Sequence, residues 1–174
     1  MLSKILFVFA TYLEAQAFEA SPDIFIAGMG PAKVRETLTS KVFEGYDEIW
    51  NIGFAGAMDK KLPFGSIYTV SVVGRHEQEG HHKLHEEGKR LITFDAPLHD
   101  PKLRDLLAHQ WDLVDMEGHV VAEIALANNI PCRLIKIVSD NADENTTASI
   151  LDNAPKLAQL LKDYVDERLE TDVL

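Results

Sequence analysis

Six consecutive apolar residues near the start of the chain constrain its fold most strongly. Residues 5–10 show no alternation of polar and apolar side chains, which is typical of a strand buried on both faces of a sheet. Similar strands are predicted at residues 23–28, 48–53, 65–73, 112–116 and 132–138. Apolar residues at helical spacing predict helices at 31–42, 102–110, 117–128 and 153–169. Strands that alternate with helices predict a three-layer α/β/α fold, with a central mixed, largely parallel sheet and helices on both faces.

The composition narrows the class of protein. The chain has 174 residues, 46% hydrophobic and 26% charged, and we predict a single domain over residues 1–174. The net charge of −11 argues against nucleic acid and anionic membrane as partners, because both need a basic surface. The single cysteine, Cys132, fits a reducing compartment. The first apolar run is too short for a membrane span or a signal peptide, so we predict a cytoplasmic protein.

Three carboxylates lie at or just beyond apolar runs. They are Glu14, Glu117 and Asp140. Burying a carboxylate is costly unless it is paired, hydrogen-bonded or used in chemistry. Open α/β sheets bind ligands beyond the carboxyl ends of their strands, and all three acids are expected there. Taken singly, Glu14 also suits the first turn of a helix and Asp140 a helix cap or turn. Their convergence is what predicts one shared pocket.

A glycine-rich turn raises the alternative of a dinucleotide cofactor. Gly28-Met29-Gly30 follows a predicted strand and precedes a predicted helix. The dinucleotide fingerprint needs a third glycine where Lys33 stands, and the acid at the end of the next strand is missing. The glycines also suit a tight turn without a ligand. A redox enzyme with a nicotinamide cofactor is therefore disfavoured, and we expect no cofactor.

Histidines and glutamates crowd residues 76–89. On a helix, His81 and His85 would share one face and could bind zinc. The segment is polar and has no apolar wall around such a site, so a solvated surface loop is favoured and no metal is expected.

The motifs around the three carboxylates resemble those of a known family. They are Ala10-Thr11-Tyr12-Leu13-Glu14, Gly28-Met29-Gly30-Pro31-Ala32-Lys33-Val34, Asn51-Ile52-Gly53-Phe54-Ala55-Gly56, Val114-Asp115-Met116-Glu117 and Ile137-Val138-Ser139-Asp140-Asn141-Ala142-Asp143. In this order, and over nearly the whole chain, they are similar to the purine nucleoside phosphorylase superfamily. The most similar branch contains the methylthioadenosine/S-adenosylhomocysteine nucleosidases and the futalosine hydrolases. The resemblance implies a nucleoside phosphorylase-like fold and cleavage of the N-glycosidic bond of a purine nucleoside.

The resemblance also implies a role for each matching residue. Asp140 would protonate or hydrogen-bond the purine at N7, and Glu14 would take a proton from the attacking water. Glu117 would hold the ribose hydroxyls, Met116 would pack against the sugar, and Ser139 would orient Asp140. The remaining substrate contacts would come from Phe54, Ala55, Gly56, Pro97 and Leu98. An acid beside the leaving base and a base behind the water match the charges that develop when such a bond breaks.

The chain departs from the family pattern in the regions that would select a substrate. The family often has Ser or Thr where Phe54 stands, and Pro97 and Leu98 replace an aromatic and aliphatic pair. The polar segment at 76–89 replaces a long insertion that helps to form the 5′-substituent pocket, partly across a dimer interface. The resemblance therefore leaves the choice between methylthioadenosine-like and futalosine-like substrates open. A homodimer is expected only by analogy.

Water is favoured over phosphate as the nucleophile. Phosphorylases of the superfamily present several arginines to phosphate, whereas Arg35 and Arg75 are the only early candidates here. Glu14 would also repel an anion. The predicted function is a nucleoside N-ribohydrolase whose partner is a small-molecule nucleoside. The alternatives are a phosphate-dependent purine nucleoside phosphorylase and a nucleoside-binding relative without turnover.

Overall fold

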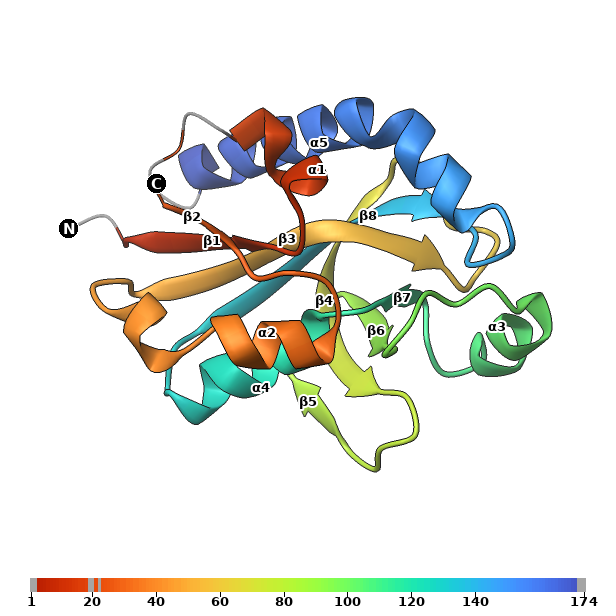
Figure 1. Cartoon of the computed structure of the whole chain (residues 1–174), viewed down its shortest axis with the longest axis horizontal. Helices are drawn as coiled ribbons and strands as arrows, with labels where there is room; N and C mark the ends of the chain where they lie inside the picture. The colour runs from red at the N-terminus through yellow and green to blue at the C-terminus, as the bar shows by residue number, and fades with distance from the viewer. Residues whose placement is uncertain (1–2, 19–20, 22, 172–174) are drawn as a thin grey trace.

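A single mixed sheet lies between two layers of helices in the computed structural model, which describes residues 3–18, 21 and 23–171 (Figure 1). The strands are β1 (Ile5–Phe9), β2 (Ile24–Ile26), β3 (Glu48–Ala57), β4 (Ile67–Arg75), β5 (His81–Lys83), β6 (Lys89–Thr93), β7 (Leu113–Asp115) and β8 (Cys132–Asp140). The helices are α1 (Tyr12–Ala15), α2 (Pro31–Thr37), α3 (Pro101–Leu107), α4 (Gly118–Ala127) and α5 (Thr146–Thr171), with short 3-10 helices η1 (Gln16–Phe18) and η2 (Ser40–Phe43).

Strand β3 is the centre of the sheet. It pairs in parallel with β1 and with β8, and its last residues pair antiparallel with β7. Strand β2 extends the sheet beyond β1. On the other side, β8 pairs with β4, β4 with β6 and β6 with β7, so the strands β3, β8, β4, β6 and β7 close a ring among the described residues. Most pairings are parallel, which confirms the predicted α/β fold with a mixed, largely parallel sheet.

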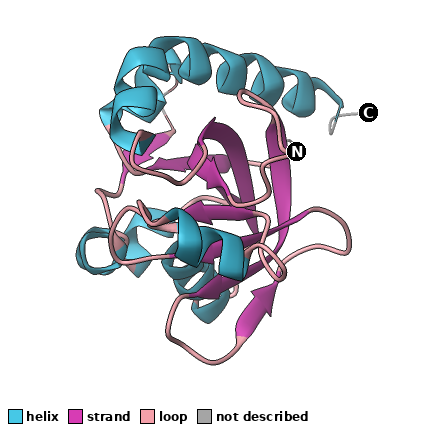
Figure 2. Ribbon diagram, turned by 90° about the vertical axis from the view of Figure 1, so that its right-hand side faces the viewer, coloured by secondary structure: helices cyan, strands magenta, loops and turns pink. Residues whose placement is uncertain are grey.

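The two helical layers cover opposite faces of the sheet. Helices α1 and α5 lie on one face, and α2 and α4 on the other (Figures 1 and 2). Alternate residues of β8 explain why both faces are apolar, because successive strand residues point to opposite sides. Ile135 packs in the cluster that contains Leu157 and Leu161 of α5, whereas Leu134 packs in the cluster that contains Val121 of α4.

Three predicted elements differ most from the structure in their limits. Strand β3 continues through Ala57, four residues beyond its predicted end at 53, and these residues pair with β7 and β8. Helix α2 ends at Thr37 because Leu38 takes a non-helical ψ of 80°. Helix α5 begins at Thr146 and runs through Pro155, well before the predicted start at 153. The polar first turn of α5 and the internal proline hide this part of the helix from a reading of periodicity.

The polar segment at 76–89 lies at the surface, as predicted, but it contains a short strand. Strand β5 pairs antiparallel with β4 within it. His81 belongs to this strand, so the prediction that His81 and His85 could share one face of a helix is wrong. Strand β6 and helix α1 were not predicted, because each is too short to show a periodic pattern. In the described part of the chain, no helix combines the length and the hydrophobicity that a membrane span needs.

Candidate active site

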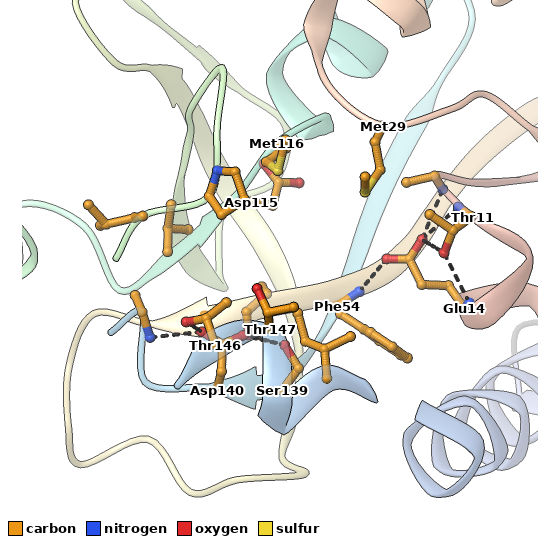
Figure 3. Close-up of a pocket in the computed structure, with 18 of the residues that line it drawn as sticks. Thr11, Glu14, Met29, Phe54, Asp115, Met116, Ser139, Asp140, Thr146 and Thr147 are labelled. Atoms are coloured by element: carbon orange, nitrogen blue, oxygen red, sulfur yellow. Dashed lines mark hydrogen bonds between the residues drawn. The ribbon is translucent and has the colours of Figure 1, made fainter. Parts of the chain in front are cut away.

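A cavity of about 330 Å³ lies at the carboxyl ends of β1, β3, β7 and β8. This volume falls in the range of small-molecule sites in proteins. All ten residues predicted for the site line it, namely Glu14, Phe54, Ala55, Gly56, Pro97, Leu98, Met116, Glu117, Ser139 and Asp140. The first turns of α5 complete its wall with Thr146, Thr147, Ile150 and Leu151. The three carboxylates that the sequence singles out therefore share one cavity (Figure 3).

Both carboxylate oxygens of Glu14 accept hydrogen bonds. It is the third residue of α1 and forms a capping box with Thr11, whose N–H (2.9 Å) and hydroxyl (3.2 Å) donate to Oε2. The backbone N–H of Ala10 donates to the same oxygen (3.1 Å), and the N–H of Phe54 on β3 donates to Oε1 (2.9 Å; Figure 3). Burial raises the pKa of the Glu14 carboxyl, although the N–H of Phe54 and the positive charge of Lys136 oppose this shift. The helix-capping and the active-site interpretations of Glu14 are thus compatible.

Two glycines of β3 leave room for the carboxylates. A Cβ on Gly53 would lie 2.7 Å from Oε1 of Glu14, and a Cβ on Gly56 would lie 2.8 Å from Oδ1 of Asp140. Real Cβ atoms do not come so close to another heavy atom, so a side chain at either position would displace a carboxylate. The resemblance implied a substrate contact at Gly56. In the structure, the space above these two glycines is taken by the acids themselves.

Glu117 is the N-cap residue of α4, but its side chain contacts the glycine-rich turn instead of capping the helix. The N–H of Gly30 donates to Oε1 of Glu117 (2.8 Å), and Gly30 has a φ of +83° that favours glycine. This turn, considered above as part of a dinucleotide fingerprint, therefore binds a carboxylate of the same chain. Burial and the negative charges of Asp115 and Glu14 raise the pKa of Glu117 to about 8.

A buried lysine lies among these acids. Lys136, on β8, is only 2% exposed, and its Nζ is 2.9 Å from Oδ2 of Asp115 and 2.8 Å from Oδ1 of Asn51. Burial by itself would lower the pKa of Lys136, but the charges of Asp115, Glu117 and Glu14 outweigh it and raise the pKa. The sequence analysis did not identify Lys136 as part of the site. A lysine within the apolar run 132–138 was the available signal.

Asp140 ends β8 and is hydrogen-bonded on both oxygens. The hydroxyl of Ser139 donates to Oδ2 (2.6 Å), while the N–H of Ala142 and the hydroxyl of Thr146 donate to Oδ1 (2.8 Å each; Figure 3). The loop that follows is held by Arg104, a buried residue of α3 whose guanidinium donates to the carbonyl of Asn141 (2.8 Å). Neither Arg104 nor Thr146 was predicted, because nothing in their sequence context marks them.

The remaining walls of the cavity are apolar. Leu98 is buried, Pro97 is exposed, and Met116 is half-buried. Met29, which is 62% exposed, lies at the edge of the cavity (Figure 3). Such surfaces suit the faces of a heterocyclic base and the apolar side of a sugar.

No lysine or arginine side chain lines the cavity in the part of the chain that the structure describes. Arg35 pairs with Glu123 (2.5 Å) and Arg75 with Asp95 (2.8 Å), so neither faces the cavity. Over residues 3–18, 21 and 23–171, no group of three or more His, Cys, Asp or Glu side chains is arranged to hold a metal ion.

Comparison with known proteins identifies the family of this chain. A profile described as the phosphorylase superfamily matches residues 75–170, which is more than half of the chain. The protein therefore belongs to the phosphorylase superfamily, as its motifs predicted.

Individual relatives fall in the predicted branch. The aminodeoxyfutalosine nucleosidase of Helicobacter pylori (strain ATCC 700392 / 26695) is 27% identical over 105 residues, which cover 57% of this chain and 45% of that protein. The chain thus matches less than half of the length of this curated relative. Among solved structures, MTAN from Chlamydia trachomatis bound to MTA has a TM-score of 0.84 at 24% identity, over 97% of this chain and 98% of the other. Futalosine hydrolase of Helicobacter pylori strain 26695 has a TM-score of 0.85 at 17% identity, over 100% and 99%. At these identities the structural matches show the fold.

Proposed function

We propose that the protein is a nucleoside N-ribohydrolase, which cleaves the N-glycosidic bond of a purine nucleoside with water as the nucleophile. The observation that carries this proposal is that Glu14, Glu117 and Asp140 line one nucleoside-sized cavity with no cationic side chain among its described lining residues. The names of the relatives point the same way, since they are nucleosidases and a futalosine hydrolase.

On the leaving-group side, Asp140 is the proposed acid. When the bond between C1′ and the base nitrogen breaks, its electron pair moves to the base. A proton from Asp140 to N7 lets the base leave neutral, which lowers the barrier to cleavage. Ser139 lies 2.6 Å from Oδ2 and keeps the acid oriented.

On the opposite side of the bond, Glu14 is the proposed base. The oxygen of the attacking water forms the new bond to C1′, and Glu14 accepts one of the protons of that water. Burial raises the pKa of Glu14 toward neutral pH, where a general base works best. The four donors to its carboxylate fix its position before the substrate binds.

The sugar would lie against Glu117 and Met116. A carboxyl group whose pKa is about 8 can both donate to and accept from ribose hydroxyls near neutral pH. Of the three acids, Asp140 carries the proton for the base and Glu117 has a pKa of about 8, so ionised Glu14 is the group that favours the positive charge that develops on the ribose in the transition state.

The two alternatives are less well supported. A phosphorylase must hold a phosphate dianion, and the described lining of this cavity offers it no cation. A binding protein without turnover would not need to keep all three carboxylates, Glu14, Glu117 and Asp140, in the cavity.

A direct assay tests the proposal. The purified protein is incubated with 5′-methylthioadenosine, S-adenosylhomocysteine, futalosine and inosine, with and without phosphate, and free base is measured by chromatography. Release of base without phosphate supports the hydrolase. Release only with phosphate, or tight binding without release, would refute it in favour of one alternative.

Two substitutions test the assigned roles. Glu14→Gln and Asp140→Asn are each expected to lower kcat by at least ~100-fold, the usual scale for general acid–base groups. Glu36→Gln and Asp166→Asn change exposed acids outside the cavity and serve as matched controls. A near-normal kcat in either active-site variant would remove that residue from the mechanism.

Some predictions from the sequence stay predictions. These are the single domain over residues 1–174, the homodimer, the cytoplasmic location and the identity of the 5′-substituent. The apolar rim of the cavity, which includes Met29 and Leu151, is compatible with more than one substituent. The same substrate panel addresses the last question.

A further inference from the structure

The two oxygens of the Asp140 carboxyl group have different surroundings. Oδ1 accepts hydrogen bonds from the N–H of Ala142 and from the hydroxyl of Thr146, both at 2.8 Å. Oδ2 contacts only the hydroxyl of Ser139, at 2.6 Å, among the hydrogen bonds of the described residues. Figure 3 shows Thr146 and Ser139 on either side of Asp140 at the cavity wall.

The hydrogen-bond partners of the Thr146 hydroxyl define the direction of its hydrogen. The backbone N–H of Asp143 donates to Oγ1 of Thr146 (3.1 Å), so this oxygen already acts as an acceptor. A hydroxyl group carries one hydrogen, and the other hydrogen-bond partner of Oγ1 among the described residues is Oδ1 of Asp140. Thr146 therefore donates to Asp140, and the buried position of Thr146 keeps solvent from competing.

These contacts leave Oδ1 unable to carry a proton toward a ligand. Its acceptor sites are used by two donors, and it occupies the space beside Gly56, where an added Cβ would lie 2.8 Å from it. Oδ2 has no such restriction. Oγ of Ser139 lies 2.6 Å from Oδ2 and 3.3 Å from the carbonyl oxygen of Ala55. Ser139 can therefore donate to an ionised Oδ2, or donate to Ala55 and accept from a protonated Oδ2.

We propose that Thr146 is a positioning residue that occupies Oδ1 of Asp140 and thereby assigns the proton of the acid to Oδ2, on the side of the leaving base. The inference rests on the proposed function. Thr146 acts through Asp140 and contacts no reacting atom. Because Thr146 is the first residue of α5, its hydroxyl also links the orientation of the acid to the docking of that helix.

The test compares variants that differ by one hydroxyl group. Thr146→Val is expected to lower kcat by about tenfold to a hundredfold, the range for loss of a hydrogen bond to a charged group, with KM changed by less than about threefold. Thr146→Ser is expected to restore kcat to within about threefold of the wild type. Should the valine variant fold poorly, Thr146→Ser and Thr146→Ala form a second pair that differs by a single oxygen. Thr171→Val, which removes an exposed hydroxyl at the far end of α5, is the matched control.

A double variant separates action through the acid from a general effect on the fold. Adding Thr146→Val to Asp140→Asn is expected to cause less than about a twofold further loss of kcat, because the acid is already absent. A further loss as large as in the wild-type background would overturn the proposal, as would equal kcat values for Thr146→Ser and Thr146→Ala. If the wild type releases no base from any nucleoside, the proposed function fails. If the wild type is active and Thr146→Val equals it, only this inference fails.

Discussion

Replacing Lys136 by methionine removes the only positive charge within contact of Asp115 among the described residues. The Nζ atom lies 2.9 Å from Oδ2 of Asp115, and both side chains are almost fully buried, at 2% and 1% exposure. Methionine has nearly the same volume and fills the same space, so the cavity left behind is small. The charge is therefore the main quantity that changes.

The expected loss of stability is large. Removing one partner of a buried ion pair costs about 3–5 kcal/mol, since the other charge stays buried without compensation. A domain of this kind has a total free energy of unfolding of about 5–15 kcal/mol, so Lys136→Met would remove a substantial part of it. Thr93 and Gly118 still donate to Asp115, which keeps the loss toward the lower end of the range.

The loss should also depend on pH. Lys136 lowers the pKa values of Glu14 and Glu117, and both are raised overall by burial. Without the lysine both pKa values rise further, so the folded variant binds more protons than the unfolded chain over a wider pH range. Stability then decreases as pH rises, and the deficit relative to the wild type is greater at about pH 8 than at about pH 5.5.

Urea unfolding at these two pH values measures the effect. Lys162→Met, which breaks an exposed pair with Asp166, is the matched control and should cost less than about 1 kcal/mol. A deficit for Lys136→Met below about 1 kcal/mol at pH 8, or the same deficit at both pH values, would refute this reasoning.

Two further predictions concern Gly56 and Glu117. Gly56→Ala should lower kcat by about tenfold or more and leave the fold intact, because the added Cβ would lie 2.8 Å from Oδ1 of Asp140 and would displace that oxygen. Steady-state kinetics measures the change in kcat, and circular dichroism checks the fold. An unchanged kcat would contradict the steric explanation. The pKa of Glu117 is raised in the folded protein to about 8, so its contribution to stability is complete below the unfolded value and is lost as pH rises through about 8. Glu117→Gln should therefore flatten the decline in melting temperature between about pH 5 and pH 8, and a decline as steep as in the wild type would show that another group causes it.

The sequence predicted those structural features that depend on the residues of a single segment. Continuous apolar runs predicted the buried strands, because a strand covered on both faces cannot tolerate polar side chains. The ends of such strands converge at one edge of the sheet, and this convergence explains why Glu14, Glu117 and Asp140 could be assigned to one pocket from their positions alone.

Other features depended on contacts between distant segments. The sequence predicted an end of β3 that is four residues too early. The length of this strand depends on its pairing with β7 and β8, which are distant in the chain. The glycine-rich turn matches part of a dinucleotide fingerprint in sequence, but in the structure it donates a hydrogen bond to Glu117, which is 87 residues away in the chain. Thr146 gave no signal, since its role comes from one hydroxyl directed at Asp140.

The amino-acid sequence by itself determined the layered α/β architecture and the three acids at the strand ends, because both follow from local hydrophobicity and from the direction of the chain. Only the tertiary structure decided how these acids are charged and held. The charges and positions of these acids depend on contacts of a few ångströms with residues far away in sequence, namely Lys136, Gly53 and Gly56. The energy of a buried charge depends on such distances, and no pattern along a single chain encodes them.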